Sequence, residues 1–154
     1  MDQFDRTRLL IGSQGMDRLK NSRVAVFGIG GVGGYVVEAL VRSGVGALDL
    51  VDSDDVSLTN LNRQIIATHQ TIGAPKTEAA KARALSINPE VKIEIHNLFY
   101  TPETEHLFDF SVYDYVVDAV DTVTAKLSII KKAKASNVPV ISSMGAGNKL
   151  RPAL

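Results

Sequence analysis

Apolar and polar residues follow two kinds of pattern along the chain. Five stretches are apolar, β-branched or alternating, as strands are: residues 23–29, 47–51, 91–98, 115–119 and 138–143. Three others carry apolar or alanine residues at helical spacing: residues 33–43, 75–87 and 122–136. Shorter helices are predicted at residues 6–11, 14–20 and 102–108. Strands alternating with helices predict an α/β fold: a Rossmann-like, doubly wound, mainly parallel sheet with helices on both faces.

The length of the chain suits one domain with a buried core. Its 154 residues show no repeat, low-complexity tract or interdomain linker. Residues 138–148 pass from a strand-like run to a glycine-rich turn, and no closing element follows. We therefore expect residues 1–154 to form one domain that is truncated at its C-terminal end.

Composition narrows the function classes only slightly. Lys plus Arg and Asp plus Glu are 17 each, so net charge argues neither for nor against nucleic acid. The absence of cysteine excludes a disulfide framework, a thiol nucleophile and a thiolate metal site within these residues. A polar start and the lack of a long apolar run predict a cytoplasmic protein without a membrane segment.

A glycine-rich turn is the first candidate site. Gly28, Gly30, Gly31 and Gly33 form the pattern G-x-G-x-x-G after a predicted strand and at the start of a predicted helix. Such a turn allows a phosphate to approach the free N–H groups of the helix, unless the glycines serve packing alone. Asp52 ends the next strand, at the position expected of a carboxylate that binds ribose hydroxyls. The motif by itself does not separate NAD, FAD and ATP.

Two cations after Asp52 favour ATP. The polar stretch 52–73 is too long for an ordinary connection, and Arg63 and Lys76 follow in it and just beyond it. Either residue alone would be read as solvated surface. Together with Asn60 and the glycine turn, they suit phosphoanhydride cleavage, which needs cations to take up charge on the phosphates.

Acidic residues near the fourth predicted strand are the third candidate. Asp121 precedes a predicted helix, so it can be an N-cap, a ligand of Mg²⁺ that also binds triphosphate oxygens, or both through different atoms. Asp118, at the strand end, is either structural or a support for that site. Parallel strands present their carboxyl ends at one edge of the sheet, so Gly28, Asp52, Asp118 and Asp121 are expected to converge there.

The histidines and the lysines of the last helix carry less weight. His69, His96 and His106 are scattered, which favours surface or loop positions over catalysis. Four lysines share the last predicted helix: Lys126, Lys131, Lys132 and Lys134. They are most simply its solvated face, and contact with RNA phosphates is the alternative.

These motifs together resemble a known superfamily. The glycine turn, Asp52, Asn60-x-x-Arg63-Gln64, Gly73-x-x-Lys76 and Asp121 are similar to those of the ThiF/MoeB, ubiquitin-activating-enzyme-like adenylyltransferases. Within that superfamily, residues 4–12, 118–126 and 141–149 look most like the tRNA threonylcarbamoyladenosine dehydratases. The resemblance covers essentially the whole chain.

The resemblance assigns roles to the matching residues. It implies that the glycine turn, Arg63 and Lys76 hold the ATP phosphates, while Asp52 binds the ribose. Asp121 would bind Mg²⁺, and Asn60 and Gln64 would complete the pocket. Arg6 matches an arginine that reaches the ATP site of the neighbouring subunit, so a homodimer is implied.

The implied reaction is adenylation of a carboxylate on tRNA, followed by cyclisation with loss of water. This reaction needs no protein nucleophile, which fits a chain without cysteine. Two alternatives stay open: activation of the C-terminal Gly-Gly of a ubiquitin-like sulfur carrier, and an NAD-dependent oxidoreductase. The resemblance also leaves open a monovalent cation and a sulfur-transfer partner. Because its relatives are longer, we expect these residues alone to be inactive.

Overall fold

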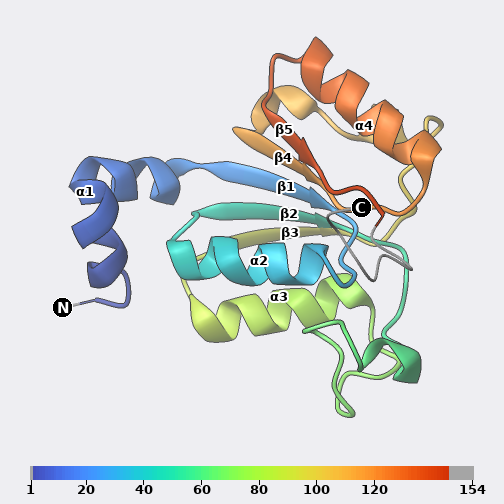
Figure 1. Cartoon of the computed structure of the whole chain (residues 1–154), viewed down its shortest axis with the longest axis horizontal. Coiled ribbons are helices and arrows are strands. Elements are labelled where there is room, and N and C mark those ends of the chain that lie inside the picture. The colour runs from blue at the N-terminus through green and yellow to red at the C-terminus, as the bar shows by residue number, and fades with distance from the viewer. Residues whose placement is uncertain (1, 146–154) are drawn as a thin grey trace, which may run out of the picture.

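The computed structural model describes residues 2–145, which form one parallel sheet covered on both faces (Figure 1). The sheet has five strands in the order β3-β2-β1-β4-β5, and every pairing is parallel. The strands are β1 Arg23–Phe27, β2 Ala47–Val51, β3 Lys92–His96, β4 Tyr115–Asp118 and β5 Val140–Ser142. The helices are α1 Asp5–Asn21, α2 Gly33–Ser43, α3 Lys76–Ile87 and α4 Val123–Ala135. The predicted Rossmann-like, doubly wound fold is confirmed.

Successive residues of β1 enter two separate cores. Val24 and Val26 face α2 and α3 in one apolar cluster, whereas Ala25 and Phe27 face α4 in another. A strand covered on both faces gains from apolar residues at every position, and this explains its continuous apolar run. Burial of each large apolar side chain in this way stabilises the fold by about 1.5–3 kcal/mol.

The strand order changes direction at β1: β2 and β3 lie on one side of it, and β4 and β5 lie on the other. In doubly wound sheets a crevice opens at this position, beyond the carboxyl ends of the strands. Gly28 follows β1, Asp52 follows β2, and Asp118 ends β4. The fold therefore brings Gly28, Asp52 and Asp118 together at one edge of the sheet, as predicted.

The N-terminal helices join at a glycine. The structure has one element, α1, in which Gly12 adopts the non-helical angles φ 71° and ψ 173°. The two predicted helices, at 6–11 and 14–20, thus lie on either side of this kink. A positive φ is tolerated because glycine has no Cβ. Across residues 2–145, no helix combines the length and apolar character that crossing a membrane requires.

The predicted helix at residues 102–108 is wrong. Only a 3₁₀ turn, Glu105–Leu107, is present there. The Thr104 hydroxyl accepts a hydrogen bond from the N–H of Thr101 (2.9 Å) and donates one to the carbonyl oxygen of Phe99 (3.1 Å). Local side-chain bonds of this kind compete with helix formation. The last part of the predicted glycine-rich turn, residues 146–148, lies outside the described residues.

Outside the crevice, a buried carboxylate links three strands of the sheet. Asp49 is 2% exposed and accepts hydrogen bonds from Arg23 Nε (2.7 Å), Arg23 Nη2 (2.9 Å) and Tyr113 Oη (3.1 Å). His96 Nε2 lies 3.2 Å from the same carboxylate. His96 therefore occupies a strand rather than the surface or loop position expected of it. Burial disfavours the charge of Asp49, but the bonds from His96 and Arg23 outweigh it and hold the pKa of the carboxyl below its usual value.

Replacing Asp49 with asparagine is expected to destabilise the fold by roughly 2–4 kcal/mol at neutral pH, because Arg23 loses its buried carboxylate partner and keeps only its ion pair with the exposed Glu94. A lowered folded pKa contributes stability that is present above the unfolded value of about 4 and is lost as the pH falls through the folded pKa. The difference in the free energy of unfolding between wild type and D49N should therefore become smaller at acidic pH. Urea unfolding at several pH values measures it, with the exposed Asp17→Asn as control. A gap independent of pH would contradict this account.

Candidate functional site

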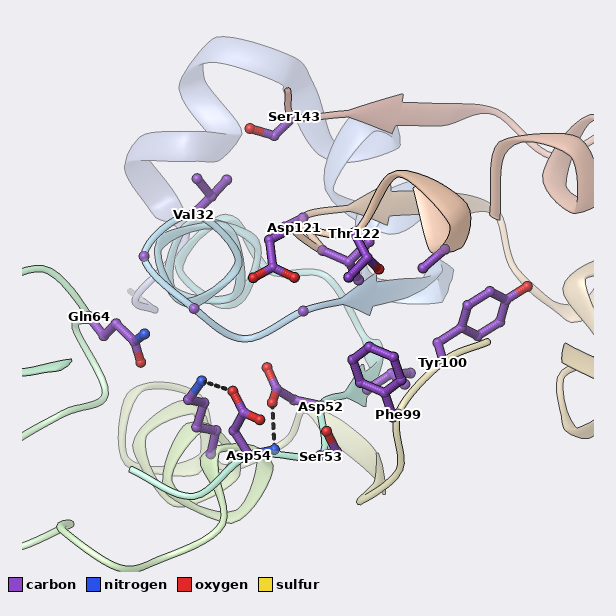
Figure 2. A pocket seen from close by; sticks show the side chains of 18 of the residues that line it. Val32, Asp52, Ser53, Asp54, Gln64, Phe99, Tyr100, Asp121, Thr122 and Ser143 are labelled. Atoms are coloured by element: carbon purple, nitrogen blue, oxygen red, sulfur yellow. Dashed lines mark hydrogen bonds and ion pairs between the residues drawn. The ribbon is translucent and has the colours of Figure 1, made fainter. Parts of the chain in front are cut away.

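A cavity of about 720 Å³ opens at the carboxyl ends of the strands (Figure 2). It brings together nine of the predicted site residues: Gly28, Gly30, Gly31, Asp52, Asn60, Arg63, Gln64, Lys76 and Asp121. Gly33 is buried directly behind the glycine turn, as the first residue of α2. The cavity therefore contains almost the whole set of residues that the sequence singles out.

The glycine turn is shaped by two close backbone contacts. Gly28 has φ +87°, and a Cβ there would lie 2.7 Å from the carbonyl oxygen of Ala119. A Cβ on Gly33 would lie 1.7 Å from the carbonyl oxygen of Gly28, which no side chain tolerates. The N-cap of α2 is Val32, whose apolar side chain cannot satisfy the first N–H groups of the helix. These groups suit an anion in the cavity.

Asp52 joins the first two strands below the cavity. Its Oδ2 accepts a hydrogen bond from the N–H of Ile29 (2.6 Å), and its Oδ1 accepts one from the N–H of Asp54 (2.8 Å). Each carboxylate oxygen has a second lone pair. Asp52 can therefore fix the turn and still have lone pairs free for the predicted hydrogen bonds from ribose hydroxyls.

Lys76 is buried, and its partner was not predicted from the sequence. It is the first residue of α3, its side chain is 7% exposed, and Nζ lies 2.7 Å from Asp54 Oδ2 (Figure 2). A buried ammonium needs such a counterion. The signal in the sequence was the second acidic residue, two positions after Asp52. Lys76 thus presents a fixed cation to the cavity.

Residues Asn60 and Arg63 lie in the loop between β2 and α3. The Asn60 side chain accepts a hydrogen bond from the N–H of Ser57 (3.0 Å) and so closes a 3₁₀ turn, Leu58–Asn60. Arg63 is exposed, and its Nη1 donates to the carbonyl oxygen of Thr59 (3.0 Å). Asn60 therefore shapes the loop, and Arg63 is presented from it to the cavity.

Gln64 is the clearest unsatisfied group of the cavity wall. Among the described residues, its buried Oε1 has no hydrogen-bond partner. Leaving such an oxygen unpaired costs about 1–3 kcal/mol. Figure 2 shows this side chain at the edge of the cavity, across from Asp54. A donor from a bound ligand would satisfy it.

Asp121 is not the N-cap of α4. The helix begins at Val123, and its N-cap is Thr122, one residue later than the N-cap reading requires. Asp121 is instead exposed on the cavity wall, and Figure 2 shows its carboxylate pointing toward the chain between β1 and α2. Its position beside the glycine turn suits the predicted role as a ligand of Mg²⁺.

The interpretation of Lys126 as a solvated residue is wrong. Lys126 is 6% exposed, and its Nζ donates to Asp118 Oδ2 (3.2 Å). Asp118 is fully buried at the end of β4, so it is a structural residue behind the cavity. Helical spacing alone could not reveal this, because Lys131 and Lys134 on the same helix are indeed exposed.

Arg6 lies outside the cavity. It is exposed on α1, which packs near the amino ends of the strands, away from the cavity at their carboxyl ends (Figure 1). Leu9 and Leu10 on the same helix are each 86% exposed. Within one chain, Arg6 therefore does not join the other predicted site residues.

Two aromatic residues of the cavity wall were missed in the sequence. Phe99 and Tyr100 follow the carboxyl end of β3 and line the cavity (Figure 2). Tyr100 is buried against Phe27, with ring centroids 5.0 Å apart, whereas Phe99 is 55% exposed. Their position after a strand end was the available signal. They extend the apolar part of the cavity lining.

Comparison with known proteins gives consistent matches. A family model described as the ThiF family matches residues 4–150. A tRNA threonylcarbamoyladenosine dehydratase of Bacillus subtilis is 50% identical over 99% of this chain, and one of Haemophilus influenzae is 46% identical over 88%. The crystal structure of the Escherichia coli enzyme in complex with ATP superposes with a TM-score of 0.93, at 36% identity over 98% of this chain.

The matched proteins are longer than this chain. It spans 60% of the Bacillus subtilis relative, 52% of the Haemophilus influenzae relative and 62% of the Escherichia coli structure. Residues 4–150, which the family model matches, contain the glycine turn, the cavity lining and the whole described sheet.

Proposed function

This chain belongs to the ThiF family, and from that premise we propose that residues 1–154 form an ATP-binding adenylation domain. The proposed activity is dehydration of threonylcarbamoyladenosine in tRNA. The observation that carries the proposal is the gathering of Lys76, Arg63 and Asp121 around one glycine turn. The names of the two dehydratase relatives support the substrate, and the ATP in the solved relative supports the nucleotide.

The proposed reaction has two steps. A carboxylate oxygen of the modified adenosine attacks the α-phosphorus of ATP, the bond to the bridging oxygen breaks, and pyrophosphate leaves. An internal nitrogen then attacks the acyl carbon and loses its proton, and AMP departs with the former carboxylate oxygen. Lys76, Arg63 and the first N–H groups of α2 stabilise the negative charge that develops on the phosphates.

The donor set of the cavity also fits Mg²⁺. Asp121 offers an exposed carboxylate on the cavity wall, which also includes Gly28, Gly30 and Gly31 of the glycine turn. Mg²⁺ is usually held by one or two carboxylates together with phosphate oxygens. When bound, the ion neutralises part of the triphosphate charge.

Each cavity is proposed to receive Arg6 from a second copy of the chain. Within one chain Arg6 is exposed and remote from the cavity, and its helix carries the exposed Leu9 and Leu10. A homodimer formed through α1 would bury these leucines and supply the missing cation.

Mixing two inactive variants tests the shared site. In a mixed dimer of R6A and K76M, the K76M chain provides Arg6 to the intact cavity of the R6A chain. We expect tRNA dehydration to reappear in the mixture, with one functional cavity per mixed dimer. A mixture of K76M and Gly33→Ala, which damage the same cavity, is the matched control and should stay inactive. No recovery from proven mixed dimers would contradict the shared site.

The activity itself is tested with the full-length protein, ATP and tRNA carrying threonylcarbamoyladenosine. Mass spectrometry should show ATP-dependent loss of one water from the modified nucleoside, and Asp121→Asn should slow it. Binding of ATP without this product would contradict the tRNA assignment. Pyrophosphate exchange stimulated by a Gly-Gly sulfur carrier, but not by tRNA, would favour the first alternative. Tight binding of NAD without a response to ATP would favour the oxidoreductase.

A further inference from the structure

A buried lysine joins three segments of the chain behind the cavity wall. Lys126 lies in the second turn of α4, and its side chain is 8% exposed. Its Nζ donates to the carbonyl oxygen of Ser143 (2.6 Å) and to Asp118 Oδ2 (3.2 Å). The shorter bond goes to the backbone that leaves β5, rather than to the carboxylate.

Asp118 is already bound by other donors. Its Oδ1 accepts a hydrogen bond from the N–H of Val120 (3.1 Å), and its Oδ2 accepts one from Ser142 Oγ (2.5 Å). Its backbone carbonyl accepts one from the N–H of Ser143 (2.9 Å). A fully buried carboxylate still needs a cation, and Lys126 supplies it. Charge balance is therefore one role of this lysine.

The segments that Lys126 connects also form the cavity wall. Ser143, Met144 and Gly145 line the cavity after β5, and Asp121 and Thr122 line it after β4. Figure 2 shows Ser143 and Asp121 on neighbouring strand ends, with the glycine turn on the far side of Asp121. Lys126 thus holds the segment that follows β5 in place relative to the segment that follows β4.

We propose that Lys126 is a positioning residue of the adenylation site, which fixes residues 143–145 against the Asp121 turn through the carbonyl oxygen of Ser143. This inference rests on the function proposed above. A neutral pair in place of Asp118 and Lys126 would leave no unpaired buried charge. It would leave the Ser143 carbonyl without its donor, and the wall would be free to shift.

A set of variants of the full-length protein separates the two roles. K126M alone leaves Asp118 buried without a cation, so it is expected to unfold at lower urea than wild type. D118N/K126M has no unpaired buried charge, and its midpoint should lie above that of K126M. Its kcat/KM for tRNA should nevertheless stay at least about tenfold below that of D118N, since misplacing a site costs up to about 100-fold. A drop smaller than this would overturn the proposal.

Two further measurements keep the result specific. K132M removes a lysine of the same helix that pairs with Glu105 at 3.5 Å, and it should leave kcat and KM unchanged. Amide hydrogen exchange at residues 143–145 should be faster in D118N/K126M than in D118N, whether or not tRNA is the substrate. Equal exchange would overturn the proposal by itself. Absence of tRNA dehydration by the wild-type protein would instead count against the proposed function.

Discussion

Replacing Gly33 with alanine is expected to abolish ATP binding. The new Cβ would lie 1.7 Å from the carbonyl oxygen of Gly28, so the turn would have to open before the helix could form. The N–H groups of α2 would then no longer face the phosphates. We also expect a loss of about 3 kcal/mol or more in the free energy of unfolding, as for severe overpacking. Calorimetry with ATP and urea unfolding measure the two effects.

Gly31→Ala is the matched comparison for stability. A Cβ at Gly31 would meet Cγ of Arg63 at 3.6 Å, which is an ordinary contact. The urea midpoint of this variant should therefore remain near that of wild type. A G33A protein that binds ATP with wild-type affinity would contradict the geometry of the turn.

Lys76→Met is expected to lower kcat by about 10²–10³-fold, the typical effect of removing one preorganised charge from a transition state. Methionine preserves the apolar stem, so the loss is attributable to the ammonium. ATP should still bind, because the glycine turn and Asp52 are intact. Steady-state kinetics with modified tRNA and calorimetry with ATP separate these two quantities.

Lys81→Met controls for the loss of a lysine from the same helix. Lys81 lies one turn further along α3, outside the cavity lining, and its variant should retain wild-type kcat. If K76M lost less than tenfold in kcat, the role of Lys76 in charge stabilisation would be wrong.

Local patterns were enough to predict the sheet and most of the cavity. Strands β1, β2 and β4 are buried along nearly their whole length, so their apolar runs are visible in the sequence, and the turn after β1 needs glycine at Gly28 and Gly33 for steric reasons. The strand ends then gather at one edge by topology alone. The ATP preference required Arg63 and Lys76 as well, because the glycine turn is shared with NAD sites.

The missed features depend on contacts between distant segments. Lys126 has the spacing of an exposed helical lysine, yet it is buried because Asp118 and the chain after β5 lie against it. The pairing of Asp54 with Lys76 and the place of Phe99 on the cavity wall likewise depend on the meeting of loops from different strands. No periodicity encodes such meetings.

In the proposed reaction, ATP activates a carboxylate of the substrate as an acyl adenylate. This activation is tested most directly by labelling that carboxylate of the modified tRNA with oxygen-18 and analysing the nucleotide products of the full-length protein by mass spectrometry. One labelled oxygen should appear in AMP, since AMP departs with the former carboxylate oxygen. Label in inorganic phosphate accompanied by ADP, or label only in water, would contradict the account.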